Sequence, residues 1–338
     1  MSDVAKKAPE SQEVGKLKAF VKREIGRVTA LASLVVIFAF FTIRRPVFAS
    51  WENVSGGILM STTVIGLLAN GSTFVISTGG MDLSVGTMMA LVGIIVGKTV
   101  MAMGLNVWLG ILLGLTVGAI LGAVNGLLIT ILKLPPFIAT LATMKGAQGL
   151  ALITSDLKPI LFTTDVKGWD SIAQGNIIPN FPNAVLILLV AAVVASIILN
   201  KTVLGRYTFA IGSNTEATKL SGVKVNRWLV AIYALCGLFV GLAAVVMTSR
   251  LGSAQPDLGL GYELEAIAAV IIGGTSLLGG KGTISGTIIG ALIMSVLING
   301  LRILELQQEW QYVVVGAVIL LAVYGDNVRR RRAGETTH

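Results

Sequence analysis

The sequence contains almost none of the residues that hold metal ions, form disulfides or carry histidine-dependent catalysis. Its 338 residues include one cysteine, Cys236, and one histidine, His338, which is the final residue. A disulfide needs two cysteines, and histidine-based metal sites and Ser-His-Asp triads need a histidine within the fold. These sites are therefore excluded within a single chain, and no other cluster indicates a membrane-embedded enzyme.

Charged residues are also scarce. They make up 13% of the chain, whereas 54% of the residues are hydrophobic, more apolar surface than a soluble core of this size can bury. The composition predicts an all-α integral membrane protein. A spanning helix needs about 20 residues, and about ten apolar segments have this length. We expect spans at 28–43, 56–77, 84–103, 107–131, 136–154, 183–200, 228–248, 262–279, 283–301 and 310–325.

The positive charges predict the orientation. With these spans, 18 Lys and Arg residues fall in segments on the side of the N-terminus and seven on the other side. Lys and Arg accumulate in cytoplasmic loops, so both termini are predicted to be cytoplasmic. This gives an N-terminal tail at 1–27, a transmembrane domain at 28–325 and a C-terminal tail at 326–338. The membrane accounts for the net charge of +9, and no nucleic-acid partner is expected.

The cytoplasmic loop 201–227 is one of the longest polar interruptions. Ser213 and Glu216 have the spacing of a capping box, and Gly222 is placed for a left-handed helix end. A helix of about two turns is not stable alone in water. We therefore expect this segment to rest on a partner protein, although an ordinary capped loop helix remains an alternative.

Regularly spaced glycines predict close helix packing. Small residues every four positions let helix backbones approach each other in lipid, as in Gly110, Gly114, Gly118, Gly122 and Gly126, and again in Gly282, Gly286 and Gly290. Asn125-Gly126-Leu127 also matches Asn299-Gly300-Leu301 five spans later. Spans five apart run in opposite directions, so this match predicts two inverted repeats.

One glycine pair follows a predicted span and a second pair lies inside another. Gly79-Gly80 is expected to break the second span, after which Asp82, two residues before Ser84, caps the next helix or forms part of a gate. Gly273-Gly274 lies within the eighth span. Glu263 and Glu265 are two residues apart and point to different helix faces, so they do not form a catalytic carboxylate pair. They either accept helix N-terminal amides or shape the outer mouth.

Four separated blocks resemble the sugar-importing ABC permeases of the ribose, galactose and arabinose group, most of all the ribose type. The resemblance covers residues 45–328. The blocks are LGRY with the following G-x-N-x-x-A and SG-V-V pattern, STGGMDLSVG, PPFIATLATM and GLGYELEAIAAVIIGGTSL. Relatives usually have an aliphatic residue in place of Asn70 and an arginine in place of Gln148.

The resemblance implies a permease of the bacterial inner membrane that imports a monosaccharide. Its partners would be a second permease copy, a subunit with tandem ATP-binding domains and a periplasmic or lipid-anchored sugar-binding protein, with the outer loop 155–183 as the docking platform. The chain itself needs no cofactor, since ATP and Mg would be held by the ATPase. The run around Lys281 is not a phosphate loop, because Gly282 follows the lysine in place of Ser or Thr. The alternative is an ion-gradient-driven secondary transporter of a small polar solute.

The resemblance also assigns roles to residues. In the coupling loop, those expected to receive movement from the ATPase are Gly205, Arg206, Gly212, Ser213, Asn214, Glu216, Ala217, Ser221 and Gly222. Polar or aromatic residues within spans are the candidates to line the substrate path: Asn70, Thr73, Phe74, Thr140, Thr143, Lys145 and Gln148. Lys145 either snorkels to the interface or donates hydrogen bonds to sugar hydroxyls.

Overall fold

The chain is almost entirely helical. The computed structural model describes residues 29–162 and 168–332; the predicted tail 1–27, two charges of the outer loop (Asp165 and Lys167) and residues 333–338 lie outside them. Its elements are the helix Thr29–Arg44, η1 (Pro46–Ala49), the π-helical η2 (Asn53–Leu59), α2 (Met60–Ser77), α3 (Val85–Met103), α4 (Val107–Ile131), α5 (Pro136–Thr154), β1 (Ile160–Leu161), α6 (Ser171–Gln174), α7 (Asn183–Lys201), α8 (Val203–Ser213), α9 (Thr215–Leu220), α10 (Val225–Leu251), β2 (Ser253–Ala254), α11 (Tyr262–Ile272), α12 (Ile284–Ile303) and α13 (Gln308–Arg332).

The predicted membrane class is confirmed. Within the described residues, eight helices are long and apolar enough to cross a membrane, and Thr29–Arg44 is a shorter apolar helix. The predicted spans 107–131 and 136–154 coincide with α4 and α5. The total of ten spans, the inverted repeats and the cytoplasmic termini stay predictions.

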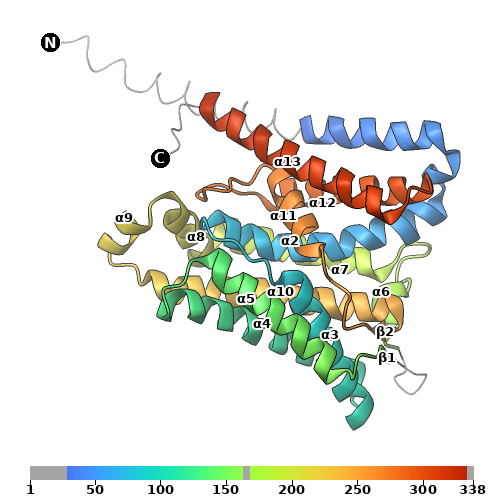
Figure 1. Cartoon of the computed structure of the whole chain (residues 1–338), viewed down its shortest axis with the longest axis horizontal. Helices are drawn as coiled ribbons and strands as arrows, with labels where there is room; N and C mark the ends of the chain where they lie inside the picture. Colours follow the sequence, from blue (N-terminus) through green and yellow to red (C-terminus); the bar gives the residue numbers. More distant parts are fainter. Residues whose placement is uncertain (1–28, 163–167, 333–338) are drawn as a thin grey trace.

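The helices surround α2. Nearly every residue of α2 is buried, and it packs against α7, α10, α11 and α12 in the main hydrophobic core. In contrast, α13 and Thr29–Arg44 run along one edge of the molecule (Figure 1) and join α12 in a smaller cluster around Phe41 and Phe48. Outer helices with apolar faces suit a lipid environment, because lipid solvates those faces without a protein partner.

The glycine spacing of α4 has the predicted structural role. Gly110, Gly114, Gly118 and Gly122 are buried, and α4 makes its most extensive contact with α10. A Cβ added at Gly118 would lie 2.8 Å from the Cα of Gly241, so the two backbones touch. In the other predicted row, Gly286 and Gly290 pack against the backbone of α11, but Gly282 lies outside α12 in the preceding loop.

The prediction of a helical span at 262–279 is wrong. Helix α11 ends at Ile272 after 11 residues, and residues 273–283 form a non-helical segment. Gly274, Gly279 and Gly280 have φ values of 89°, 86° and 74°. Only glycine adopts this backbone region without strain. Helix breaks that are surrounded by protein are typical of transporters.

Two ends of the molecule can be distinguished in Figure 1. Helices α8 and α9 lie at one end, which we call the α9 end. The strands β1 and β2 and helix α6 lie at the opposite end, which we call the β end. The two strands pair antiparallel, with Ile160 opposite Ala254. The predicted topology makes the α9 end cytoplasmic and the β end external.

Candidate functional site

Helices α8 and α9 form a projecting elbow. Thr202 caps α8, and Asn214 caps α9 by accepting a hydrogen bond from the Ala217 amide at 2.9 Å. The predicted capping box is therefore wrong. Ser213 is instead the last residue of α8, a helix that was not predicted, so the cap position is Asn214. The Glu216 carboxylate accepts from Lys219 at 2.6 Å instead of from the cap amide.

The end of α9 is as predicted. Gly222 has φ = 83° and its amide donates to the carbonyl of Lys219, which closes the helix in a left-handed turn. One side of α9 rests on the protein through the buried Thr218. The other side is open, and the side chain of Leu220 is 89% exposed. Among the large hydrophobic residues that the structure describes, Leu220 has the largest exposed fraction, so it is available to a partner protein.

Most of the coupling residues predicted from the resemblance are also exposed: Arg206, Ser213, Asn214, Glu216, Ala217, Ser221 and Gly222. Gly205 and Gly212 are placed differently. Gly205 is buried where α8 turns back on the last carbonyls of α7, including that of Leu199. The structure thus separates an outer set of residues available to a partner from two glycines that face the protein.

Gly212 belongs to what we call the glycine junction: Ser77, Gly79, Gly212, Gly279 and Gly280. A Cβ at Gly212 would meet the carbonyl oxygen of Ser77, and it would lie 2.5 Å from the amide nitrogen of Gly280. The Gly280 amide donates to the Ser77 carbonyl at 2.9 Å. A Cβ at Gly279 would lie 2.7 Å from the Gly79 amide nitrogen. The junction therefore joins the end of α8 to the end of α2 and to the loop after α11.

The predicted break at Gly79-Gly80 is confirmed, since α2 ends at Ser77 and Gly79 has φ = 80°. The chain then returns into the helical layer, where the Asp82 side chain is 2% exposed. Its carboxylate accepts from the Ser84 amide at 2.9 Å and the Ser84 hydroxyl at 2.5 Å. The Asn125 amide donates to Asp82 at 3.3 Å and to Ser84 at 2.8 Å.

This geometry corrects two expectations for Asp82. Ser84 is the N-cap of α3, so Asp82 binds the cap residue and not the first amides of the helix. Asp82 also lies deeper than a span end, beside Asn125, which is six residues before the end of α4. Burial raises the pKa of the Asp82 carboxyl, and the hydrogen bonds from Ser84 and Asn125 oppose that rise. The network ties the segment after α2 to α4.

We expect Asp82→Asn to destabilise the protein by about 1–3 kcal/mol, because it places an amide NH₂ against that of Asn125 and leaves a buried polar group unsatisfied. The reciprocal Asp82→Asn/Asn125→Asp pair restores a donor facing an acceptor. We therefore expect the pair to recover much of the loss in thermal unfolding of the detergent-solubilised protein. Equal unfolding temperatures for the single and double variants would contradict this role.

The predicted path residues divide into two groups. Asn70, Thr73, Phe74 and Thr140 are fully buried between helices. Thr73 shares a hydrogen bond of 2.7 Å with Thr287, and Thr140 accepts from the Leu83 amide at 3.2 Å. Thr143, Lys145 and Gln148 lie along α5, where Lys145 is exposed and donates to Gln148 at 3.2 Å. The structure does not bring the two groups to one surface, and their path role stays a prediction.

The two carboxylates in the first turn of α11 have different surroundings. Glu263 accepts from the amide of Gly261, the N-cap of α11, with both oxygens at 3.1 Å. This confirms one of its two predicted roles, a bond to the helix N-terminus. Glu265 instead lines a cavity with Tyr262 and Arg302. Gly273 packs against the backbone of Gly286, and Gly274 begins the non-helical segment.

Several residues were missed by sequence reasoning. Gly279 and Gly280 belong to the junction, and Leu220 is the exposed apolar residue of α9. The signal for the glycines was present in the sequence, since two successive glycines favour positive φ. A single leucine carries no such signal. The pairing of Asn125 with Asp82 had no sequence signal, because 43 residues separate them.

These features define a class of protein. A bundle of apolar helices, broken at two places that meet at the end of α8, is a multi-pass membrane protein of the transport type. A family model described as "Branched-chain amino acid transport system / permease component" matches residues 55–323. The chain belongs to this family of transport-system permeases.

Individual relatives agree with the family. The chain is 46% identical to the ribose import permease of Bacillus subtilis over 90% of its own length and 93% of that protein. It is 39% identical to the ribose import permease of Escherichia coli K12, over 95% and 99% of the two chains. The fructose import permease of Rhizobium meliloti is 36% identical, over 94% and 89%. No solved structure matches significantly. The resemblance to sugar-importing permeases, and with it the bacterial membrane location, is confirmed.

Proposed function

We propose that the chain is the membrane-spanning permease subunit of an ATP-driven, binding-protein-dependent importer of a monosaccharide, either ribose or a similar pentose or hexose. The family supports the transport class, and relatives named as ribose and fructose import permeases support the sugar. One structural observation carries the mechanism: Gly212, at the end of α8, contacts both Ser77 and Gly280.

Movement would pass through that contact. ATP-driven closure of a partner ATPase would push α9, which follows α8 after a single residue, Asn214. The glycine junction would then shift the end of α2 and the loop after α11. Because these backbones touch without intervening side chains, a small displacement of α8 moves both. Two permease copies would use this motion for alternating access at their shared axis.

The remaining partners follow from the same proposal. ATP and Mg would bind to the ATPase subunit, which has tandem nucleotide-binding domains. The sugar-loaded binding protein would dock at the β end, where the outer loop 155–183 includes the exposed residues Asp170, Asn176 and Asn180. Exposed polar residues around an interface guide encounter more than they add affinity.

Reconstitution tests the proposal. Proteoliposomes with the permease, the ATPase and ribose-loaded binding protein are expected to import ribose only when ATP is present. Removing the ATPase should abolish uptake, and collapsing the ion gradients with ionophores should leave it unchanged. Uptake that follows an ion gradient and ignores ATP would overturn the proposal in favour of a secondary transporter.

Leu220 provides a test of the ATPase contact. We expect Leu220→Asp to weaken co-purification of the ATPase subunit at least tenfold, a loss of about 1.4 kcal/mol, because it places a charge in an apolar contact. Leu157 is a matched control, since it is 74% exposed and lies in the loop leading to β1 at the β end. Leu157→Asp should retain the ATPase. Equal retention by both variants would remove α9 from the interface.

A further inference from the structure

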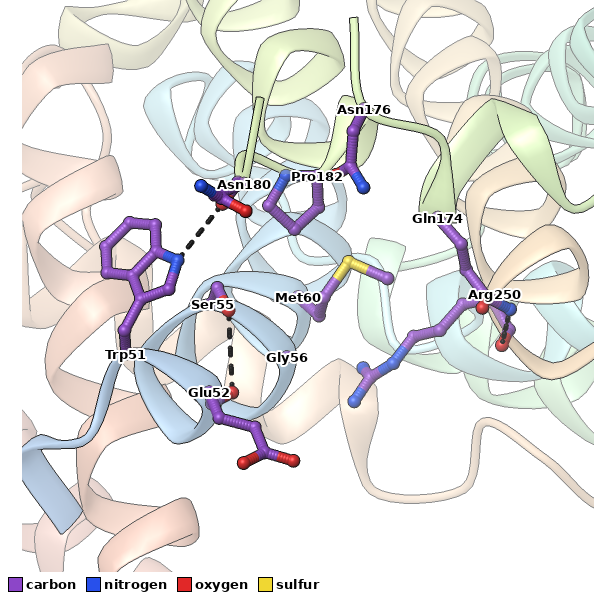
Figure 2. Close-up of a pocket in the computed structure, with 10 residues that line it drawn as sticks. All are labelled: Trp51, Glu52, Ser55, Gly56, Met60, Gln174, Asn176, Asn180, Pro182 and Arg250. Atoms are coloured by element: carbon purple, nitrogen blue, oxygen red, sulfur yellow. Dashed lines mark hydrogen bonds between the residues drawn. The ribbon is translucent and has the colours of Figure 1, made fainter. Parts of the chain in front are cut away.

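A cavity of about 560 Å³ opens at the β end between η2, the segment around α6 and the end of α10 (Figure 2). We call it the outer cavity. Its volume lies within the range of small-molecule sites. The lining is polar and aromatic: Trp51, Glu52, Ser55, Gly56, Met60, Gln174, Asn176, Asn180, Pro182 and Arg250.

Hydrogen bonds hold several of these side chains in place. The indole nitrogen of Trp51 donates to the Asn180 carbonyl at 3.1 Å, which fixes the ring while 52% of the residue stays exposed. The Gln174 amide donates to the carbonyl of Arg250 at 2.9 Å. Figure 2 shows Trp51 and Arg250 on opposite sides of the cavity, with Met60 between them. The outer cavity thus has a fixed aromatic side and a cationic side.

A second cavity of about 290 Å³, which we call the inner cavity, lies between α2, α11, α12 and α13. Arg250 links the two cavities, because its guanidinium donates to the hydroxyl of Ser61 at 3.5 Å. Met60 lines the outer cavity and Ser61 the inner one, so the two are separated only by the first turn of α2. We call these two neighbouring cavities together the cleft.

The chemistry of the cleft favours a neutral ligand with many hydroxyl groups. Each cavity has one carboxyl and one guanidinium group, Glu52 with Arg250 and Glu265 with Arg302, so neither is lined by several charges of one sign. These groups accept and donate hydrogen bonds in the planar geometry that neighbouring hydroxyls match. The inner cavity is also lined by Ser295, which is 1% exposed and whose hydroxyl has no hydrogen-bond partner.

The cleft is closed toward the α9 end. Helices α2 and α12 continue past the inner cavity, and there Thr73 and Thr287 share a hydrogen bond of 2.7 Å in a fully buried contact. The outer cavity thus lies at the β end, and α2 and α12 are in contact beyond the inner cavity. This is the arrangement that a ligand entering from the β end requires.

We propose that this cleft binds the transported monosaccharide, with Trp51 at its entrance and Tyr262, Glu265 and Arg302 around an inner subsite. The inference rests on the proposed function and adds the location of the sugar. It differs from the path predicted from the sequence, because only Thr73 of that set is placed here, as part of the closed contact.

Thiol labelling tests the cleft without ATP or partner subunits. Cys236 is fully buried, so Ser61→Cys introduces an accessible thiol against a low background. A small membrane-impermeant thiol reagent should modify it. Ribose at about 100 mM should slow labelling several-fold, whereas glycine betaine at equal osmolality should not, as expected for a weak site occupied by mass action. Labelling unaffected by ribose, or no labelling, would overturn the proposal.

Transport kinetics provide the second test and distinguish a sugar site from a docking site. In the reconstituted importer, Glu265→Gln and Trp51→Leu should lower the maximal uptake rate five- to tenfold. The concentration of loaded binding protein at half-maximal rate, and its stimulation of ATP hydrolysis, should not change. Matched controls are Glu305→Gln and Trp108→Leu, at exposed positions outside the cleft.

A higher requirement for binding protein together with lost ATPase stimulation would show that the cleft receives the binding protein instead. Wild-type kinetics in both cleft variants would also overturn the sugar site. Failure of ATP-dependent uptake by the unmodified importer would instead count against the proposed function, which keeps the two outcomes separate.

Discussion

Replacing Gly212 by valine is expected to lower sugar uptake per ATP hydrolysed by about five- to 150-fold, the range that typical coupling free energies produce. The added side chain would meet the carbonyl of Ser77 and the amide of Gly280. Both obstacles are backbone atoms, which no change of side-chain rotamer removes. The end of α8 would therefore move away from α2 and from the loop after α11, and force applied to α9 would no longer reach them.

The measurement is the ratio of ribose imported to ATP hydrolysed in proteoliposomes with both partner subunits. Gly316→Val in α13 is the control, because it puts the same β-branched residue into a helix where nothing lies within 4 Å of an added Cβ. Wild-type coupling in Gly212→Val, with its membrane insertion intact, would show that force bypasses the glycine junction.

The largest effect on stability is expected for Gly118→Leu. A Cβ at this position would lie against the carbonyl of Gly237 and 2.8 Å from both the Cα and the amide nitrogen of Gly241. Separating α4 from α10 would open their extensive contact, so the loss should reach or exceed the roughly 1–3 kcal/mol typical of an overpacked core. We expect little folded protein to survive extraction.

Thermal unfolding and the yield of monodisperse protein in detergent measure this loss. Gly146→Leu is the matched control, since it makes the same change in α5 with no atom within 4 Å of the added Cβ. It should unfold within a few degrees of the unmodified protein. A similar unfolding temperature for Gly118→Leu would contradict the close approach of α4 and α10.

Sequence reasoning predicted the ends of the spans well where polar residues flank an apolar run. The loop 132–135, with Lys133 and Pro135, separates α4 from α5 at the predicted residues. It failed at 262–279, because apolar side chains continue past Ile272 and hydropathy does not detect a change in backbone conformation. The three glycines with positive φ carried the missing information, but glycines in this chain also mark helix packing.

Sequence reasoning identified the residues of the candidate site better than the contacts between them. The coupling segment was placed within a few residues, yet its N-cap is Asn214 and not Ser213, because Thr202 starts a preceding helix that had been read as loop. The junction joins residues about 70 to 200 positions apart in the sequence, such as Ser77, Gly212 and Gly280. A single sequence without aligned relatives has no signal for such distant contacts. The cleft was missed for the same reason.

The short length of α11 has an electrical consequence. Its 11 residues extend about 16 Å, roughly half of the hydrocarbon thickness that an ordinary spanning helix crosses. If water fills the cleft on one side of α11, the membrane potential falls over that shorter distance, and the local field is correspondingly stronger. A charge displaced beside α11, such as that of Glu265, would then sense a larger share of the voltage than its movement in ångströms implies.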